Sequence, residues 1–357
     1  MSRLEDNAMG PEELSGPHPG GADRLGDEPA WRRLLRRARV GVRDRPGYAL
    51  LGITASLFAG LVAVYGLSDV AQRTLNGLVA GSYFALGAVG LTLVYGILKL
   101  VNFAHGDMLT FGAYMALLFS AGLGLPSLVA MAAGVLATAG LGLAFERLLW
   151  RPMRRKRAGL LQLLLTAIGL ALFIRSGIQF VAGTAQRSLD VDVLASVEFL
   201  GLRIGTTELI VVVVGVAVLT LVAVLLRVTS VGRQMRALSD NFSLAETTGV
   251  DTSRIVALTW VFGAGLAGLA GVLYAAAAGS FNPNLGFLLL LTLFAAVILG
   301  GIGNAYGALV GGMFLGLTQE WSTLVIDSRW KIAIGFVILI MVLIVRPNGL
   351  FGRAAKI

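Results

Sequence analysis

The chain has 357 residues, of which 56% are hydrophobic and only 14% are charged, and its mean hydropathy is +0.81. A soluble domain carries roughly 25% charged residues, so this composition excludes a soluble fold and predicts a membrane protein with several spans. The absence of cysteine excludes disulfides, thiol catalysis and Cys-ligated zinc. Two histidines cannot supply an H-E-x-x-H zinc site, and no lysine follows a glycine as a Walker A loop requires. We therefore expect no cofactor or metal here, and any ATP hydrolysis belongs to another chain.

The net charge of +9 comes from basic residues that cluster beside apolar segments rather than on a soluble domain. Such clusters follow the rule that Lys and Arg flank membrane spans on the cytoplasmic side. This explanation is favoured over nucleic-acid binding.

Residues 1–47 are predicted to form a disordered cytoplasmic tail. The first 30 residues contain seven acids, four prolines and five glycines, a composition that cannot bury enough apolar surface to fold. Seven arginines follow, between residues 32 and 45, and they should hold the N-terminus in the cytoplasm. A signal peptide has the same order of basic and apolar residues, but the acidic stretch and the lack of a clear A-x-A site argue against one.

Apolar segments fill residues 48–346, the predicted transmembrane domain, and residues 347–357 follow as a cytoplasmic tail. The segments cover 48–67, 70–98, 108–124, 127–150, 159–182, 208–226, 255–278, 287–317 and 332–345. A bilayer needs about 20 residues, so segment 70–98 should be tilted or broken. The sequence GGIGN at 300–304 divides 287–317 into two short tilted helices or a re-entrant pair. We predict an all-α polytopic protein with about 8–10 transmembrane helices, some Gly-broken or re-entrant, and both termini in the cytoplasm.

A polar segment, NFAHGD at 102–107, interrupts the apolar sequence. Asn102, His105 and Asp107 either line a translocation path, hold a metal or relay protons, or satisfy free backbone groups at a helix end. The last of these alternatives, a structural role at a helix end, is favoured. Arg175 lies within segment 159–182, where an ionisable residue suggests function, although it is only about 10 Å of helix from the boundary and can snorkel there. Snorkelling is the favoured explanation for Arg175.

The loop 227–254 is long for a compact membrane bundle, and long loops tend to be functional. Its composition predicts one or two short surface helices, with Ser239 or Asp240 capping the second. Gly-interrupted apolar pairs occur in both halves, at 77–107 and 287–316, and paired broken segments of this kind point to a transport site.

Four collinear stretches resemble the branched-chain amino-acid ABC transporter permeases of the LivH type. They begin GLVAGSYFALGAVG at 77, GRQMRALSDNFSLAETTG at 232, FAAVILGGIGNAYG at 294 and RPNGLFG at 346. The resemblance covers about residues 70–352, so the tail 1–47 lies outside it.

The resemblance implies a permease subunit of an importer in the bacterial inner membrane. Its implied partners are a LivM-type second permease, two ATP-binding subunits, a periplasmic substrate-binding protein and membrane lipid. It also implies that loop 227–254 couples the permease to the ATPases. The implied coupling residues are Arg233, Arg236, Asp240, Ala245, Glu246 and Gly249, although the usual Glu-Ala-Ala order is here Ser243-Leu244-Ala245.

The alternative is a self-contained transporter driven by protons or sodium, with Arg175 and Asp107 as coupling groups. A membrane enzyme is disfavoured because the sequence shows no convergent cluster of acids, bases or metal ligands. The residues do not separate branched-chain amino acids from urea, amides or other amino acids as the transported solute.

Overall fold

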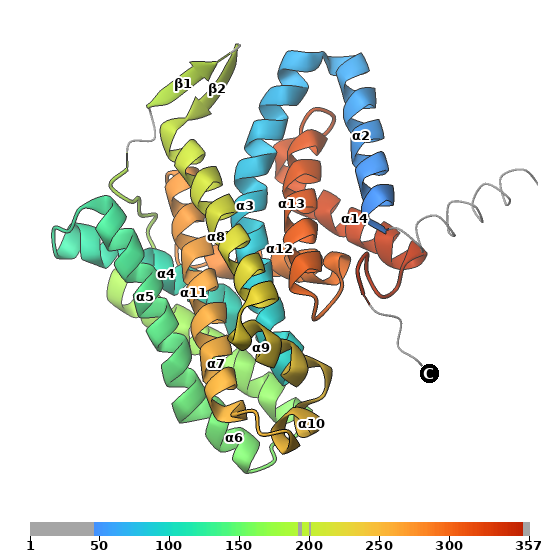
Figure 1. Ribbon diagram of the computed structural model, residues 1–357. Coiled ribbons are helices and arrows are strands. Elements are labelled where there is room, and N and C mark those ends of the chain that lie inside the picture. Colours follow the sequence, from blue (N-terminus) through green and yellow to red (C-terminus); the bar gives the residue numbers. More distant parts are fainter. Residues whose placement is uncertain (1–45, 192–194, 200, 353–357) are drawn as a thin grey trace, which may run out of the picture. The chain divides into compact units, whose positions relative to one another are not determined.

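The computed structural model describes residues 46–191, 195–199 and 201–352, so nearly all of the predicted N-terminal tail lies outside the described residues. Helix α2 (Pro46–Tyr65) begins just before the compact unit Leu51–Ile357, and every contact discussed below lies within that unit. This unit is a bundle of helices with a short two-stranded hairpin at one end (Figure 1).

Each predicted apolar segment contains helix, with ends shifted by a few residues. The remaining helices are α3 (Leu67–Leu98), α4 (Ala104–Leu117), α5 (Ser127–Phe145), α6 (Arg151–Arg155), α7 (Leu160–Ala182), α8 (Thr206–Val228), α9 (Ser230–Asp240), α10 (Phe242–Thr247), α11 (Thr252–Ala278), α12 (Leu285–Gly300), α13 (Ala305–Ser322) and α14 (Lys331–Val345). Within the described ranges, five helical stretches are long and apolar enough to cross a membrane: α3, α5 to α6, α7, α8 and α11. The polytopic helical class is thus confirmed, while the exact number of crossings stays a prediction.

Helix α3 is the central element of the bundle and packs against α8, α11, α12 and α13. It runs without interruption over 32 residues, about 48 Å at the rise of an α-helix. Of the two predicted alternatives for this segment, a break is thus absent from the helix, and a tilt stays a prediction. The chain leaves the helix at Lys99, whose φ of 52° is left-handed, so the interruption lies in the polar segment that follows.

Glycines allow α3 and α13 to touch through their backbones. A Cβ on Gly77 would lie 2.8 Å from the Cα of Leu317, and one on Gly312 would lie 2.6 Å from the backbone nitrogen of Ala85. Gly316 meets the backbone of Gly81 in the same way. The pairs Gly77/Gly81 and Gly312/Gly316, each with three residues between the glycines, thus face each other, as expected where small residues let helices approach in lipid.

The segment between α7 and α8 contains the only strands in the described part of the chain. Strands β1 (Ser196–Phe199) and β2 (Leu202–Gly205) pair antiparallel, with Glu198 opposite Arg203. This hairpin is a small addition to an otherwise helical fold. The strands do alternate polar and apolar residues, as in Ser196-Val197-Glu198-Phe199, but each has only four residues, the shortest length at which such alternation indicates a strand.

The predicted C-terminal tail does not begin as a free segment. Residues 349–352 lie against the turn between α12 and α13, where the Leu350 amide donates to the Leu299 carbonyl (2.8 Å) and the Phe351 amide donates to the Gly300 carbonyl (3.1 Å). The turn itself needs glycine, because Gly301 has a φ of 104° and a Cβ there would meet the backbone of Gly352. The last two stretches of the resemblance therefore form one packed unit.

Replacing Asn304 with alanine should destabilise this unit by about 1–2 kcal/mol. The Asn304 side chain accepts a hydrogen bond from the Gly307 amide (3.1 Å) at the start of α13 and donates to the Phe351 carbonyl (3.2 Å). Thermal melting of the purified protein would measure the loss. Asn304→Asp, which retains the cap acceptor, should recover part of it, and equal melting of all three proteins would contradict the capping role.

Candidate functional site

The polar segment 102–107 is buried inside the bundle. Asn102, His105 and Asp107 are each 0% exposed. The Asn102 side-chain oxygen accepts from the Ala104 amide (3.1 Å) and so satisfies a free backbone group at the start of α4, as the helix-end alternative predicted. His105 Nε2 lies 2.9 Å from the carbonyl of Gly87 on α3. These two side chains fix the start of α4 against the central helix.

Asp107 and Arg175 form a two-point ion pair between α4 and α7. Arg175 Nε lies 2.9 Å from Asp107 Oδ1, and Nη2 lies 3.0 Å from Oδ2. The guanidinium also lies 4.4 Å from the ring centre of Phe287 on α12. This parallel geometry is the strongest form of Arg–carboxylate contact, and the aromatic face adds attraction to the cation.

The ion pair corrects two predictions made from sequence. Arg175 does not snorkel to the membrane boundary, since its side chain is only 15% exposed and is directed to Asp107. Asp107 pairs with this arginine rather than with free backbone groups at the helix end. The sequence could not reveal the pairing because the two residues are 68 positions apart.

Helix α4 is also tied to α12. The Gly286 amide donates to the Thr110 hydroxyl (2.9 Å), and Gly106 and Gly286 touch through their backbones. With the contacts above, one short helix is joined to α3, α7 and α12. The three buried polar residues and Arg175 thus form one cluster around α4, here called the α4 cluster.

The loop 227–254 forms two short helices, as predicted, but with a different cap. The Asn241 side chain, rather than Ser239 or Asp240, caps α10 by accepting from the Leu244 amide (3.0 Å). Helix α9 is amphipathic, since Met235 and Leu238 are buried while Arg233 is exposed.

The predicted coupling residues divide by exposure. Arg233, Arg236, Asp240, Glu246 and Gly249 are exposed, whereas Ala245 is only 4% exposed and packs inside the helix pair. The Arg236 guanidinium donates to the Leu226 carbonyl at the end of α8. Arg233 also bonds to α8, donating to the Val228 carbonyl (2.9 Å). The two arginines and the buried Ala245 therefore hold α9 and α10 in place, while Glu246 and the apolar Leu244 remain exposed on α10.

Hydrogen bonds join α9 to the end of the central helix. The Ser239 hydroxyl donates to the Gly96 carbonyl on α3 (3.0 Å). Lys99 Nζ donates to the same carbonyl (2.8 Å) and to the Ser239 carbonyl (3.4 Å). These hydrogen bonds would thus transmit a displacement of α9 directly to α3.

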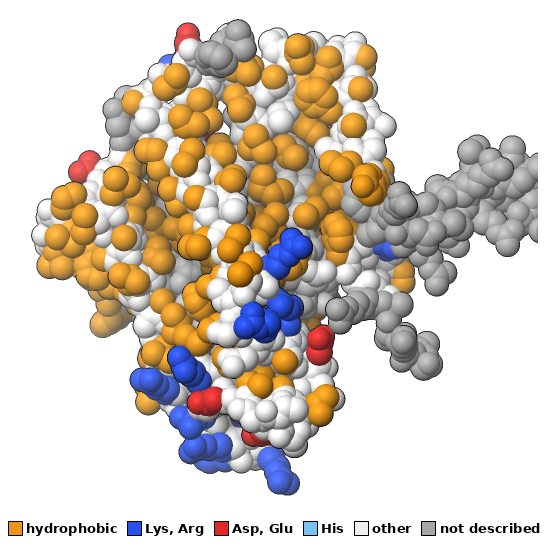
Figure 2. All heavy atoms as spheres, viewed as in Figure 1, with side chains coloured by type: hydrophobic (Ala, Val, Ile, Leu, Met, Phe, Trp, Pro, Cys, Tyr) orange, Lys and Arg blue, Asp and Glu red, His pale blue; other side chains and the backbone are white. Residues whose placement is uncertain are grey.

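Lysine and arginine side chains gather at the end of the molecule that carries α6, α9 and α10, next to a wide hydrophobic surface (Figure 2). Helix α6 and its flanking turns contribute Arg147, Arg151, Arg154, Arg155, Lys156 and Arg157. Glu146 is paired with Arg154 within this group. The opposite end carries the hairpin (Figure 1). Within the described ranges, no group of three His, Cys, Asp or Glu side chains is arranged to hold a metal ion.

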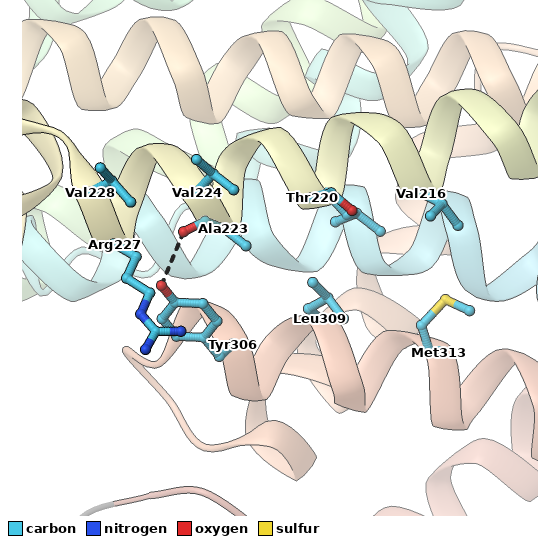
Figure 3. Close-up of a pocket in the computed structure, with 10 residues that line it drawn as sticks. Val216, Thr220, Ala223, Val224, Arg227, Val228, Tyr306, Leu309 and Met313 are labelled. Atoms are coloured by element: carbon cyan, nitrogen blue, oxygen red, sulfur yellow. Dashed lines mark hydrogen bonds between the residues drawn. The ribbon is translucent and has the colours of Figure 1, made fainter.

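An apolar groove of about 620 Å³ lies between α8 and α13. Figure 3 shows Val216, Thr220 and Val224 on one side, with Leu309 and Met313 facing them from α13. The hydroxyl of Tyr306 donates to the Ala223 carbonyl (3.1 Å), so this polar group already has a partner. The lining suits hydrocarbon or an apolar helix better than a polar solute.

A bundle of apolar helices around buried polar groups, with a basic end that carries a packed helix pair, defines a multi-pass membrane transport protein. Residues 73–345 match the family described as branched-chain amino acid transport system / permease component. The chain belongs to this family. The match confirms the predicted resemblance and supports a permease subunit over a self-contained secondary transporter. It is a family of transport components rather than of enzymes.

Several curated proteins are similar over most of the chain. The high-affinity branched-chain amino acid transport system permease protein LivH of Salmonella typhimurium is 32% identical over 295 residues, covering 79% of this chain and 95% of that protein. BraD of Pseudomonas aeruginosa, a permease protein of the same description, is 33% identical with the same coverage. A probable LivH of Methanocaldococcus jannaschii is 27% identical over 304 residues, or 80% and 94% of the two chains. No solved structure matches significantly.

Proposed function

We propose that the chain forms the translocation pathway of an ABC importer in the bacterial inner membrane. Its solute is a branched-chain amino acid or a related small polar molecule such as another amino acid, an amide or urea. The proposal is supported by the family to which the chain belongs and by the transport systems for which the similar permeases are named. The partners are a LivM-type permease, two ATP-binding subunits and a periplasmic binding protein.

The charge distribution supports one orientation in the membrane. Basic residues favour the cytoplasmic side, and they gather at the end with α6, α9 and α10. We infer that this end faces the cytoplasm and the hairpin faces the periplasm, and we keep both termini inside the cell as part of the proposal.

The observation that carries the proposal is the attachment of α9 and α10. A docking helix transmits force only if it is held to the transmembrane helices, and α9 is bonded to the ends of both α3 and α8. Leu244 and Glu246 on α10 are exposed, and Leu244 is 60% exposed although it is apolar. We assign this α10 surface as the contact with an ATP-binding subunit.

Within the pathway, the α4 cluster has a positioning role. Asn102, His105 and Asp107 are fully buried between helices, and Arg175 is occupied by Asp107. We assign to these four residues the fixing of α4 along the pathway rather than direct recognition of the solute.

Leu244→Glu tests the docking surface. Placing a charge at the centre of an interface commonly costs well over 1 kcal/mol, so ATP-dependent uptake into proteoliposomes should fall at least tenfold. The permease pair should still assemble, since Leu244 is outside the core. Leu244→Met keeps the apolar volume and should retain uptake. Full uptake by Leu244→Glu, or uptake driven by an ion gradient without ATP, would contradict the proposal.

A further inference from the structure

A polar pocket of about 430 Å³ lies at the hairpin end of the bundle, far along α8 from the docking helices. Its lining includes Gln72, Asn76, Arg203, Thr207, Glu208 and Ala277. These residues come from α3, β2, α8 and α11. The volume is at the small end of the roughly 300–1,000 Å³ of small-molecule sites.

A side chain of α3, Gln72, bonds the hairpin over this pocket. Gln72 Nε2 donates to the Arg203 carbonyl (2.7 Å), and Gln72 Oε1 accepts from the Arg203 amide (2.9 Å). Both bonds use the main chain of Arg203. The guanidinium is exposed and is positioned separately: Nε donates to the Ser196 hydroxyl (2.9 Å) and lies 3.9 Å from the carboxylate of Glu198, which is itself exposed. A guanidinium has five N–H donors, so this bond leaves capacity to bind a carboxylate.

Glu208 supplies the opposite charge on the same pocket. One carboxylate oxygen, Oε2, accepts from the Gly205 amide (3.0 Å) at the start of α8. An ionised carboxylate has about four acceptor positions, so it can still bind an ammonium group. The methyl groups of Ala276 and Ala277 add a small apolar wall.

Polar side chains occur along α3 from the pocket toward the middle of the bundle. Gln72, Asn76 and Tyr83 occupy positions i, i+4 and i+11 of α3, which fall on one face of the helix. The Tyr83 ring meets Tyr274 of α11 edge-on, with 5.2 Å between ring centres. Polar side chains of α3 thus share one helix face from the pocket to the contact with α11.

We propose that this pocket is a subsite for a zwitterionic α-amino acid, with Arg203 binding the carboxylate and Glu208 binding the ammonium group. The inference rests on the proposed transport function and narrows its solute class. A ligand with one charge binds only one of the two charged side chains of the pocket, and urea binds neither as an ion. The subsite therefore selects amino acids over amines, carboxylic acids and urea.

The cysteine-free sequence allows a direct test. Ala277→Cys places one thiol in the pocket, and its labelling by a small maleimide is followed on the assembled complex in nanodiscs. The competitors are leucine, isoamylamine, isocaproate and urea. Leucine should slow labelling at a concentration at least tenfold below that of either singly charged analogue, while urea should not protect.

Two variants and one control sharpen the result. Glu208→Gln keeps an acceptor for the Gly205 amide but loses the charge, and Arg203→Gln keeps both main-chain bonds to Gln72. Each should raise the protective leucine concentration at least tenfold. Ser328→Cys, exposed on the turn before α14, should be labelled without protection.

Equal protection by leucine and isoamylamine, no protection by leucine, or no labelling of Ala277→Cys would overturn the subsite. The readout does not use ATP. Failed protection with ATP-driven uptake intact therefore rejects the subsite alone, and protection without ATP-driven uptake rejects the proposed function alone.

Discussion

Arg175→Met is expected to destabilise the protein by about 3–5 kcal/mol, because removing one member of a buried ion pair leaves the other charge without compensation. The stranded group is the Asp107 carboxylate, which is 0% exposed and receives two bonds from Arg175. The methionine side chain keeps much of the length of arginine and the contact with Phe287. The loss of stability therefore reflects chiefly the removal of the charge. The measurement is the denaturant or thermal midpoint of the purified protein in detergent.

The double variant Asp107→Leu/Arg175→Met separates this explanation from a loss of packing. Replacing both members of a buried ion pair with apolar residues often leaves the stability of a protein unchanged. The double variant should therefore regain most of the stability that Arg175→Met loses. The exposed pair Asp327–Arg329 offers a matched control on the turn between α13 and α14. The Arg329 guanidinium lowers the pKa of the Asp327 carboxyl, yet Arg329→Met should leave the midpoint unchanged because water screens both groups. A single Arg175→Met as stable as the parent would refute the role of the pair.

The spans could be predicted from the sequence because their signal is local. An apolar run of 18 or more residues predicts a membrane helix by itself, and polar or Gly-rich segments mark its ends. The segments around 159–182, 208–226 and 255–278 correspond closely to α7, α8 and α11. The two helices in loop 227–254 were predicted from local composition in the same way.

The features that the sequence did not reveal depend on contacts between distant residues. The partner of Arg175 lies on another helix, and the main-chain bonds of Arg203 depend on Gln72, 131 positions earlier. For α3, length alone could not decide between a tilt and a break. The contacts that accompany its continuity are again distant in sequence, since Gly77 and Gly81 lie against the backbone of α13. Polar residues at fixed helical spacing, such as Gln72 and Asn76, were the signal that could have located the pocket.

Gly271→Ala is the second variant with a large expected effect. A Cβ at this position of α11 would overlap the carbonyl group of Leu109 and lie 2.9 Å from its Cα on α4. Backbone cannot move aside as the end of a flexible side chain does, so α4 and α11 must separate. The cost should reach or exceed the upper end of the about 1–3 kcal/mol typical of overpacking.

The separation of α4 from α11 in Gly271→Ala should also disturb contacts away from residue 271. Helix α4 carries Asp107 and His105, so moving it from α11 strains the contacts to Arg175 and Gly87. We expect a lower melting temperature and poor recovery of the assembled complex. Gly169→Ala on α7 is the matched control, since no heavy atom lies within 4 Å of its Cβ position and alanine favours helix over glycine by about 0.5–1 kcal/mol. If the two variants melt alike, the close approach of α4 and α11 does not hold the bundle together, and the cluster around α4 must be positioned by its polar contacts alone.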